Sequence, residues 1–403
     1  MADDSPSRFL LLLPSAPSPP SLQELKKSFG DTVLQVLQEV ATASPESSKA
    51  AILEIAIACP CLANPGPASR GQLYDETQTN LAAVYKLVCI IAAANDINVE
   101  DSDGVDVSVL LLAWSPDSVT TASTFGPVVT LETLAHADRA WQYAFGDESA
   151  AGEALVKAFV AAKGSDKTIS RLQSGAASQA TSDPDVGTAK PSTTGPSSTV
   201  RNKRHHDVAV GGTFDHLHIG HKLLLTMTLF LPEKWSEARP ATAIVGITGD
   251  QLLVNKKHAS VLESWQDRQR AVEDFCDSII DFELKDAPKS KQVTKQNDHG
   301  PNGKAVNLHY PAGLVVKCTE IQDPFGPTIT EESISALIIS AETRSGGKAV
   351  NDKRKEKGWH ELEVFEVDVL DADEGGAVKE GFESKLSSTA IREKLARKQG
   401  AKV

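Results

Sequence analysis

The segment from Gly164 to Thr199 most constrains how this chain can fold. It is rich in Ser, Thr, Ala, Gly and Pro and has almost no large apolar side chains. Such a segment cannot bury enough apolar surface to offset its chain entropy. We therefore predict three parts: an N-terminal α/β region at 1–163, a flexible linker at 164–204, and a second domain at 205–403. A chain of 403 residues is long enough for two or three domains.

The N-terminal region has the pattern of an α/β fold. Apolar runs predict strands at Phe9–Leu13, Ala51–Ala58 and Val105–Trp114, and apolar spacing predicts helices over Leu22–Val40 and Ala135–Ala162. The region has no Gly-rich phosphate loop and no cluster of residues with the spacing of metal ligands. The sequence therefore indicates no catalytic or binding function for this region.

The C-terminal region alternates strands with helices. The predicted strands are Val208–Val210, Ala243–Thr248, Leu314–Ile321, Ala336–Ser340 and Glu361–Val369, and the predicted helices are His218–Phe230, Leu262–Phe282 and Ser388–Lys398. This alternation predicts an α/β fold with a doubly wound, Rossmann-like parallel sheet covered by helices on both faces. Residues 285–311 are polar and contain Gly and Pro, so we predict an inserted surface loop there.

The charge of the chain limits its partners. Its formal net charge is −13 and its pI is about 5.3, so it lacks the overall basic character of a nucleic-acid-binding surface. We expect no nucleic-acid partner, and local positive charge wherever a phosphorylated substrate binds. The basic cluster Arg201–Arg204 leaves two interpretations open, a nuclear-localisation signal and, as we favour, a solvated linker end.

Cysteine usage and hydrophobicity favour a cytoplasmic protein. The five cysteines are scattered, and Cys59-Pro60-Cys61 lacks the spacing of a zinc site, so we expect reduced thiols. The apolar run Phe9–Leu13 is short and ends at Pro14. We expect neither this run nor any other segment to cross a membrane.

One motif stands where a strand leads into a helix, from Gly211 to His221. Gly211 and Gly212 permit a tight turn, and Gly220 leaves room for a nucleotide against the backbone. His218 and His221 share one face of the opening helical turn, where the helix N-terminus favours phosphate. Imidazole donors there can stabilise charge developing on an α-phosphate. The alternative is that both histidines only cap the helix or pack, but their spacing after a Gly-Gly-Thr turn favours a phosphate site.

A second motif opens the last predicted helix. Ser387, Ser388 and Thr389 are small hydroxyl residues, and Arg392 follows one turn later. Alone, such residues indicate an ordinary N-cap. The same small side chains leave first-turn N–H groups accessible to an anion, and Arg392 adds positive charge.

Together the two motifs resemble those of the nucleotidyltransferase superfamily. His218-Ile219-Gly220-His221 is similar to its (Thr/His)-x-Gly-His signature, and Ser387–Arg392 is similar to its Ser-Ser-Thr-x-Ile-Arg motif. The resemblance implies that His221 stabilises the transition state at the α-phosphate, His218 contacts phosphate and Thr213 orients the attacking group. It implies that Mg²⁺ arrives with ATP, without protein ligands. The implied ATP-binding residues are Gly211, Gly212, Thr213, Phe214, His218, Gly220, His221, Ser387, Ser388, Thr389 and Arg392.

Further segments resemble the eukaryotic branch of phosphopantetheine adenylyltransferases. They are Val245–Thr248, Asn255–Lys257 with Asp267-Arg268, Ile321–Pro327 and Ser340–Thr343. The resemblance implies transfer of AMP from ATP to 4′-phosphopantetheine, giving 3′-dephospho-CoA and pyrophosphate in coenzyme A biosynthesis. It makes Lys256 and Arg268 candidate ligands of the 4′-phosphopantetheine phosphate. Because the chain has no Gly-x-x-x-x-Gly-Lys-(Ser/Thr) loop, we expect no dephospho-CoA kinase activity.

Several alternatives stay open at this point. Bacterial members have an arginine near the position of Ser340, and Arg344 and Arg354 are candidates to replace it. Class I aminoacyl-tRNA synthetases share the His-x-Gly-His motif, but this chain lacks their Lys-Met-Ser-Lys-Ser motif. The remaining alternatives are another adenylyl- or cytidylyltransferase, and a non-catalytic scaffold whose N-terminal region contacts other enzymes of the coenzyme A pathway.

Overall fold

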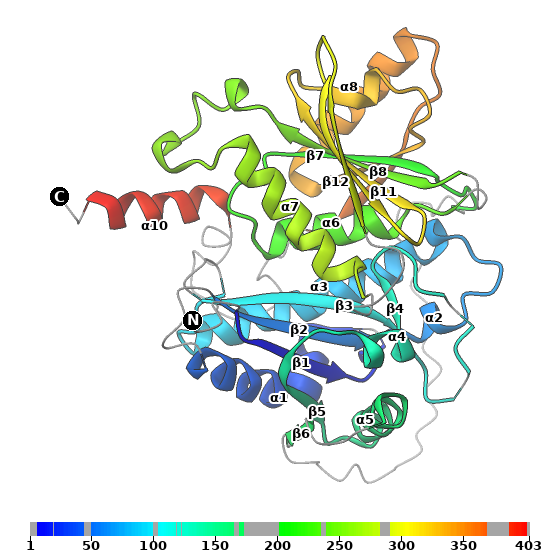
Figure 1. Ribbon diagram of the computed structural model, residues 1–403, viewed down its shortest axis with the longest axis vertical. Coiled ribbons are helices and arrows are strands. Elements are labelled where there is room, and N and C mark those ends of the chain that lie inside the picture. Colours follow the sequence, from blue (N-terminus) through cyan, green and yellow to red (C-terminus); the bar gives the residue numbers. More distant parts are fainter. Residues whose placement is uncertain are drawn as a thin grey trace, which may run out of the picture.

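Two α/β units make up the described part of the molecule (Figure 1). The structure is a computed structural model, which describes residues 6–18, 20–43, 50–99, 104–117, 119–121, 123–164, 169–172, 201–234, 239–282, 291–368 and 387–400. The first unit extends to residue 172 and the second begins at residue 201. Each unit has its own sheet, and helices fill the layer between the two sheets.

The N-terminal unit is built on a six-stranded sheet with the order β4-β3-β2-β1-β5-β6. All its strand pairs are parallel. Its core strands are almost continuously apolar because helices cover both faces. The strands are β1 (Arg8–Leu13), β2 (Ala51–Ala58), β3 (Val105–Ala113), β4 (Val128–Thr130), β5 (Trp141–Asp147) and β6 (Ile169–Leu172), and the helices are α1 (Leu22–Thr42), α2 (Pro60–Ala63), α3 (Arg70–Ala94), α4 (Leu131–His136) and α5 (Ala150–Lys163).

Two sequence predictions for this unit were wrong. The predicted helix over Ala135–Ala162 is interrupted by strand β5, whose aromatic residues favour an extended backbone. Helix α5 starts only at Ala150, where Ser149 caps it by accepting a hydrogen bond from the Gly152 N–H. Residues 169–172, assigned to the flexible linker, form strand β6 and pair with β5. The remainder of the predicted linker up to residue 200 lies outside the described residues.

The C-terminal unit confirms the predicted sheet and extends it. The seven strands have the order β13-β12-β7-β8-β11-β10-β9. The first five are mutually parallel, and their order reverses between β7 and β12, as in doubly wound folds. These strands are β7 (Asp207–Gly212), β8 (Ala241–Thr248), β11 (Leu314–Ile321), β12 (Ala336–Ser340) and β13 (Glu363–Val367), and the main helices are α6 (Ile219–Phe230), α7 (Trp265–Ile280), α8 (Arg344–Glu356) and α10 (Ser388–Gly400).

The predicted inserted loop at 285–311 is largely a β-hairpin. Strands β9 (Gln292–Asn297) and β10 (Lys304–Tyr310) pair antiparallel with each other, and β10 pairs antiparallel with β11. Strand β10 has buried and half-buried positions only, whereas nearly every residue of β9 is exposed. This polar edge strand explains why the segment looked like a loop. Residues 283–290 lie outside the described residues.

The two units share a continuous hydrophobic core. One cluster of buried side chains joins the N-terminal sheet, helices α3, α6 and α7, and the C-terminal sheet. Asn202, Lys203 and Arg204 of the basic cluster are exposed, in keeping with a solvated linker end. Arg201 nevertheless forms an ion pair with Asp75 of α3, in the other unit, at 2.8 Å, and Arg204 forms one with Glu233 of its own unit. The units are therefore packed against each other, not merely tethered.

Helix α3 is long and apolar enough to cross a membrane by length and composition, contrary to the sequence expectation. In this structure 61% of its most apolar window is buried. It packs against α1 on one side and α6 on the other. A core helix passes the same test, and this burial identifies α3 as one.

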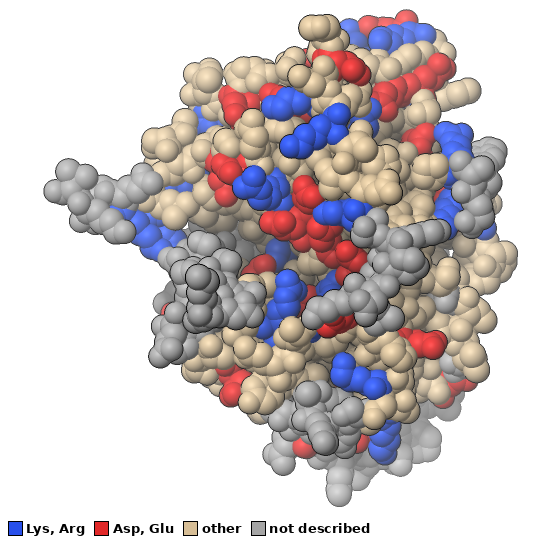
Figure 2. Space-filling model, viewed as in Figure 1, with Lys and Arg blue, Asp and Glu red and all other residues tan. Residues whose placement is uncertain are grey.

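The face in Figure 2 carries mixed charge, and the five cysteines are buried or half-buried. On the face in Figure 2, acidic and basic side chains are interspersed, without a broad basic area. All five cysteines are free. Burial, followed by the charge of Glu76, raises the pKa of Cys61 to about 12, which makes this thiol unreactive near neutral pH.

Candidate active site

The candidate site lies at the carboxyl end of β7, beside the point where the strand order reverses. In doubly wound sheets this crevice is the usual place for a ligand. The loop from Thr213 to His218 connects β7 to α6 there. Gly211 is exposed, and a Cβ added to it would meet nothing within 4 Å, so the end of β7 is open to a ligand.

The loop itself is held in an unusual backbone conformation. Phe214 and His216 both have positive φ angles, 53° and 46°. Non-glycine residues in this region are strained by about 1–3 kcal/mol, and such strain is common at functional sites. Phe214 is fully buried, and Glu263 accepts a hydrogen bond from the His216 N–H at 2.7 Å. These contacts fix the approach to the helix.

The two histidines stack on each other at the start of α6. Their ring centroids are 3.9 Å apart with an interplanar angle of 27°. His218 occupies the N-cap position, but its side chain makes no capping hydrogen bond. The Nδ1 atoms of both His218 and His221 are buried without a partner. An unsatisfied buried polar atom costs about 1–3 kcal/mol, which a bound ligand could recover.

Both imidazoles are neutral at pH 7. Burial lowers the pKa of His218 to about 4, although Asp215 opposes this shift. Burial, reinforced by His218, also holds the pKa of His221 well below its ordinary value. Neutral rings can donate N–H hydrogen bonds to phosphate, and a bound polyanion would favour proton uptake by either ring.

The second motif meets the first, as the sequence predicted. Ser388, the first residue of α10, places its Oγ 3.4 Å from His218 Nε2. Ser387 accepts a hydrogen bond from the Ala390 N–H at 3.3 Å and so caps the helix start. Two helix N-termini from opposite ends of the unit thus converge on one place.

Arg392 joins these helix starts through a buried ion pair. Its guanidinium donates to Asp215 at 2.5 Å, to the Lys257 carbonyl at 3.0 Å and to Thr389 Oγ1 at 3.2 Å. Arg392 is 3% exposed and Asp215 is fully buried. Arg392 therefore fastens α10 to the loop after β7. Because its guanidinium is bonded in this way, the geometry does not favour the predicted direct contact between Arg392 and phosphate.

The two candidate ligands of the acceptor phosphate lie in different surroundings. Lys256 is exposed, so its side chain is free to move toward a phosphate. It precedes Lys257, whose carbonyl accepts a hydrogen bond from Arg392. Arg268 is fully buried and donates to Asp250 at 2.6 Å and to the Thr213 carbonyl at 2.7 Å. Arg268 therefore supports the loop at Thr213 and does not face a ligand.

The two candidates for the replacement arginine differ, because Arg354 is fully engaged inside the protein whereas Arg344 lies at the surface. Arg354 is 1% exposed and donates to five backbone carbonyls, among them those of Thr328 and Ile334. Arg344 forms an exposed ion pair with Glu366, which raises the pKa of Arg344.

The glycines act more through packing than expected. A Cβ at Gly212 would meet the Phe214 ring at 3.0 Å, and one at Gly220 would meet the His218 ring at 3.2 Å. Gly220 thus makes room for the imidazole, where the sequence predicted room for a nucleotide.

Sequence reasoning missed Asp215 and Glu263, which hold the loop. Asp215 also accepts a hydrogen bond from the Glu263 N–H at 3.0 Å. The sequence held one signal for Asp215: an acidic residue next to the Gly-Gly-Thr turn would repel a phosphate, which indicates a supporting role.

Comparisons with known proteins divide the chain at the same place as the fold. Residues 1–183 match a family described as a domain of unknown function (DUF8446). Residues 209–394 match the cytidylyltransferase-like family, so the C-terminal unit is a nucleotidyltransferase-like domain.

Curated relatives include proteins from fungi and archaea. An uncharacterized protein of Schizosaccharomyces pombe is 38% identical over 47% of this chain and 48% of its own length. A phosphopantetheine adenylyltransferase of Saccharomyces cerevisiae is 35% identical over 48% of this chain and 49% of its own length. One from Methanothermobacter thermautotrophicus is 26% identical over 47% of this chain and 85% of its own length. The matches span about half the length of the two fungal relatives.

Proposed function

We propose that this protein is a pantetheine-phosphate adenylyltransferase, which transfers AMP from ATP to 4′-phosphopantetheine. One observation carries the proposal: Ser388 Oγ lies 3.4 Å from His218 Nε2, so the two motifs resembling those of nucleotidyltransferases meet in one crevice. The relatives named phosphopantetheine adenylyltransferase support the choice of acceptor. We further propose that the protein is monofunctional and acts in the cytoplasm.

The proposed step is a direct displacement at phosphorus. A phosphate oxygen of 4′-phosphopantetheine forms a bond to the α-phosphorus of ATP. The bond from the α-phosphorus to the bridging oxygen breaks, and pyrophosphate leaves with that electron pair. The attacking group is already an anion, so the protein needs no covalent intermediate and mainly orients the reactants.

The residues divide this work between them. Neutral His221 and His218 donate hydrogen bonds to the α-phosphate as charge builds on it. First-turn N–H groups of α10, together with Ser388, hold the β- and γ-phosphates. Thr213, at the open end of β7, orients the attacking phosphate, and Lys256 supplies mobile positive charge.

Mg²⁺ is proposed to enter with ATP as part of the substrate. The donor set around His218 consists of imidazoles and hydroxyls, which suits phosphate better than Mg²⁺. The nearby carboxylate of Asp215 is already bonded to Arg392 and to the Glu263 N–H. Among the described residues no group of three His, Cys, Asp or Glu side chains has metal-binding geometry.

The test is an assay of the purified full-length protein with ATP and Mg²⁺. Acceptors are 4′-phosphopantetheine, nicotinamide mononucleotide and a phospho-alcohol, with pyrophosphate release and dephospho-CoA as readouts. Turnover restricted to 4′-phosphopantetheine is expected. Faster turnover of another acceptor would favour a different nucleotidyltransferase, and ATP binding without any product would favour the scaffold.

A further inference from the structure

Helix α6, which carries His221, is bonded at its start to the N-terminal unit. Lys222 follows His221 directly, and its side chain is only 6% exposed. Its ammonium forms an ion pair with Asp106 and donates to the Val107 carbonyl at 2.8 Å and to Ser108 Oγ at 3.3 Å. All three acceptors belong to β3, so the first turn of α6 is fastened to a strand of the other sheet.

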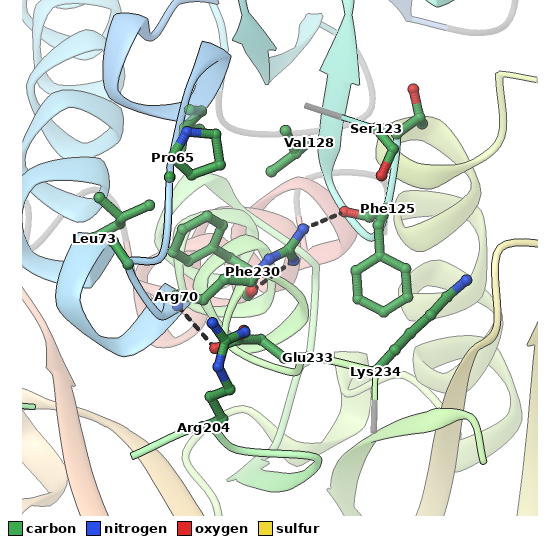
Figure 3. Close-up of a pocket in the computed structure, with 14 residues that line it drawn as sticks. Pro65, Arg70, Leu73, Ser123, Phe125, Val128, Arg204, Phe230, Glu233 and Lys234 are labelled. Carbon is green, nitrogen blue, oxygen red and sulfur yellow. Dashed lines mark hydrogen bonds and ion pairs between the residues drawn. The ribbon is translucent and has the colours of Figure 1, made fainter. Parts of the chain in front are cut away.

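The end of α6 is bonded to the same unit. Arg70, the first residue of α3, donates to the Phe230 carbonyl at 2.8 Å and to the Phe125 carbonyl at 2.9 Å. Its guanidinium lies over both phenyl rings, at 4.9 Å from Phe125 and 5.2 Å from Phe230. The Arg70 N–H donates to Glu233 at 2.9 Å, just beyond the end of α6 (Figure 3).

These two anchors control where the histidines lie. A helix of 12 residues is about 18 Å long, so a tilt of about 3° moves one end by about 1 Å. A displacement of about 1 Å at a reacting centre can cost about 100-fold in rate. Because the side chain of His218 does not cap α6, the helix has no side-chain cap that could fix its start locally.

We propose that the N-terminal region positions the catalytic helix, with Lys222 and Arg70 as the two anchoring residues. This inference rests on the proposed function, because it takes His218 and His221 as the groups that contact phosphate. Lys222 and Arg70 are positioning residues, because their side chains form hydrogen bonds between the two units. The region matched by a family of unknown function thereby gains a role in turnover.

The experiment uses full-length Lys222→Met and Arg70→Met, which remove the charge and keep a long apolar side chain. We expect kcat to fall about 10- to 100-fold while KM for ATP stays within about threefold. Hydrogen–deuterium exchange in peptides covering 213–230 should rise. Lys222→Arg keeps the charge and should restore part of kcat.

The matched control is Arg139→Met. Arg139 is also a buried cation that bridges the units, but it pairs with Glu54 at 2.7 Å and donates to the Asp281 carbonyl, after α7, at 2.7 Å. Its hydrogen bonds go to Glu54, Asp277 and Asp281, none of which belongs to α6. We expect a comparable loss of stability, with normal exchange in 213–230 and kcat within about twofold of the wild type.

Each outcome either supports or contradicts the positioning role of the N-terminal region. An equal fall in kcat for Arg139→Met, or unchanged exchange and turnover in Lys222→Met, overturns the inference. If the wild type does not turn over 4′-phosphopantetheine but the exchange pattern still separates the variants, the proposed function fails and the positioning role stands. Should the Met variants not fold, Ser108→Ala removes one of the three acceptors of Lys222 and should give a smaller change in the same direction.

Discussion

The two sheets follow the same plan, yet only one has a helix start left open at its switch point. The strand order reverses between β1 and β5 in the N-terminal unit and between β7 and β12 in the C-terminal unit. After β1 the chain runs through Pro14 into α1, which Ser21 caps by accepting from the Glu24 N–H at 3.3 Å. After β7 it runs into α6, which has no side-chain cap.

The same contrast extends to the other long helices. Ser69 caps α3 in a complete capping box with Gln72, and Ser149 caps α5. The long helices of the N-terminal unit thus have side-chain caps, whereas α6 has none. The two sheets therefore share their topology but differ at the start of the helix that follows the switch-point strand.

The largest expected effect concerns the buried carboxylates of the two units. Glu54 and Asp215 are both fully buried and both paired with arginine. Arg392→Met leaves Asp215 buried and unpaired, and should cost about 3–5 kcal/mol of unfolding free energy, measured in urea. Adding Asp215→Asn should recover most of this loss, since Asn can still accept from the Glu263 N–H. Additive losses in the double variant would contradict the ion-pair interpretation.

The second prediction compares kcat after substitution of a histidine in each unit. His221→Ala should lower kcat by about 100-fold or more, because a donor to the developing charge is lost. His136 of α4 is exposed and bonds only to the Glu132 carbonyl, so His136→Ala serves as the control with unchanged kcat. Equal rates for the two variants, measured as pyrophosphate release, would remove His221 from the mechanism.

A third effect is a pH dependence that belongs to the C-terminal unit. The pKa of His218 is about 4 in the folded protein and about 6.5 in the unfolded chain, so the unfolded chain takes up the proton first. Stability should therefore fall as the pH falls from about 6.5 to about 4, by up to about 1.4 kcal/mol per pH unit from this group. His218→Gln should flatten the slope of the melting temperature in this range. An unchanged slope would mean that His218 is not buried as described.

The sequence predicted which site residues lie together, but it did not predict the contacts that support them. His218, His221 and Ser388 could be placed together because both motifs resemble those of one superfamily. Their partners could not be placed, since Asp215 and Arg392 are 177 residues apart and nothing local pairs them. The β9–β10 hairpin was missed because an exposed edge strand has a loop-like composition. The contact between the units was missed because Lys222 and Arg70 look like surface cations in the sequence.

The smallest effect compares two serines at helix starts. Ser149 only caps α5, so Ser149→Ala should cost about 1 kcal/mol of unfolding free energy and leave kcat and KM unchanged. Ser388 instead faces His218, while Ser387 provides the cap of α10. Ser388→Ala should therefore leave stability within about 0.5 kcal/mol and raise KM for ATP by about tenfold, the loss of one hydrogen bond to a charged group. If both variants lost stability and neither changed KM, Ser388 would be an ordinary cap, and the start of α10 would not differ in role from the capped helix starts of the N-terminal unit.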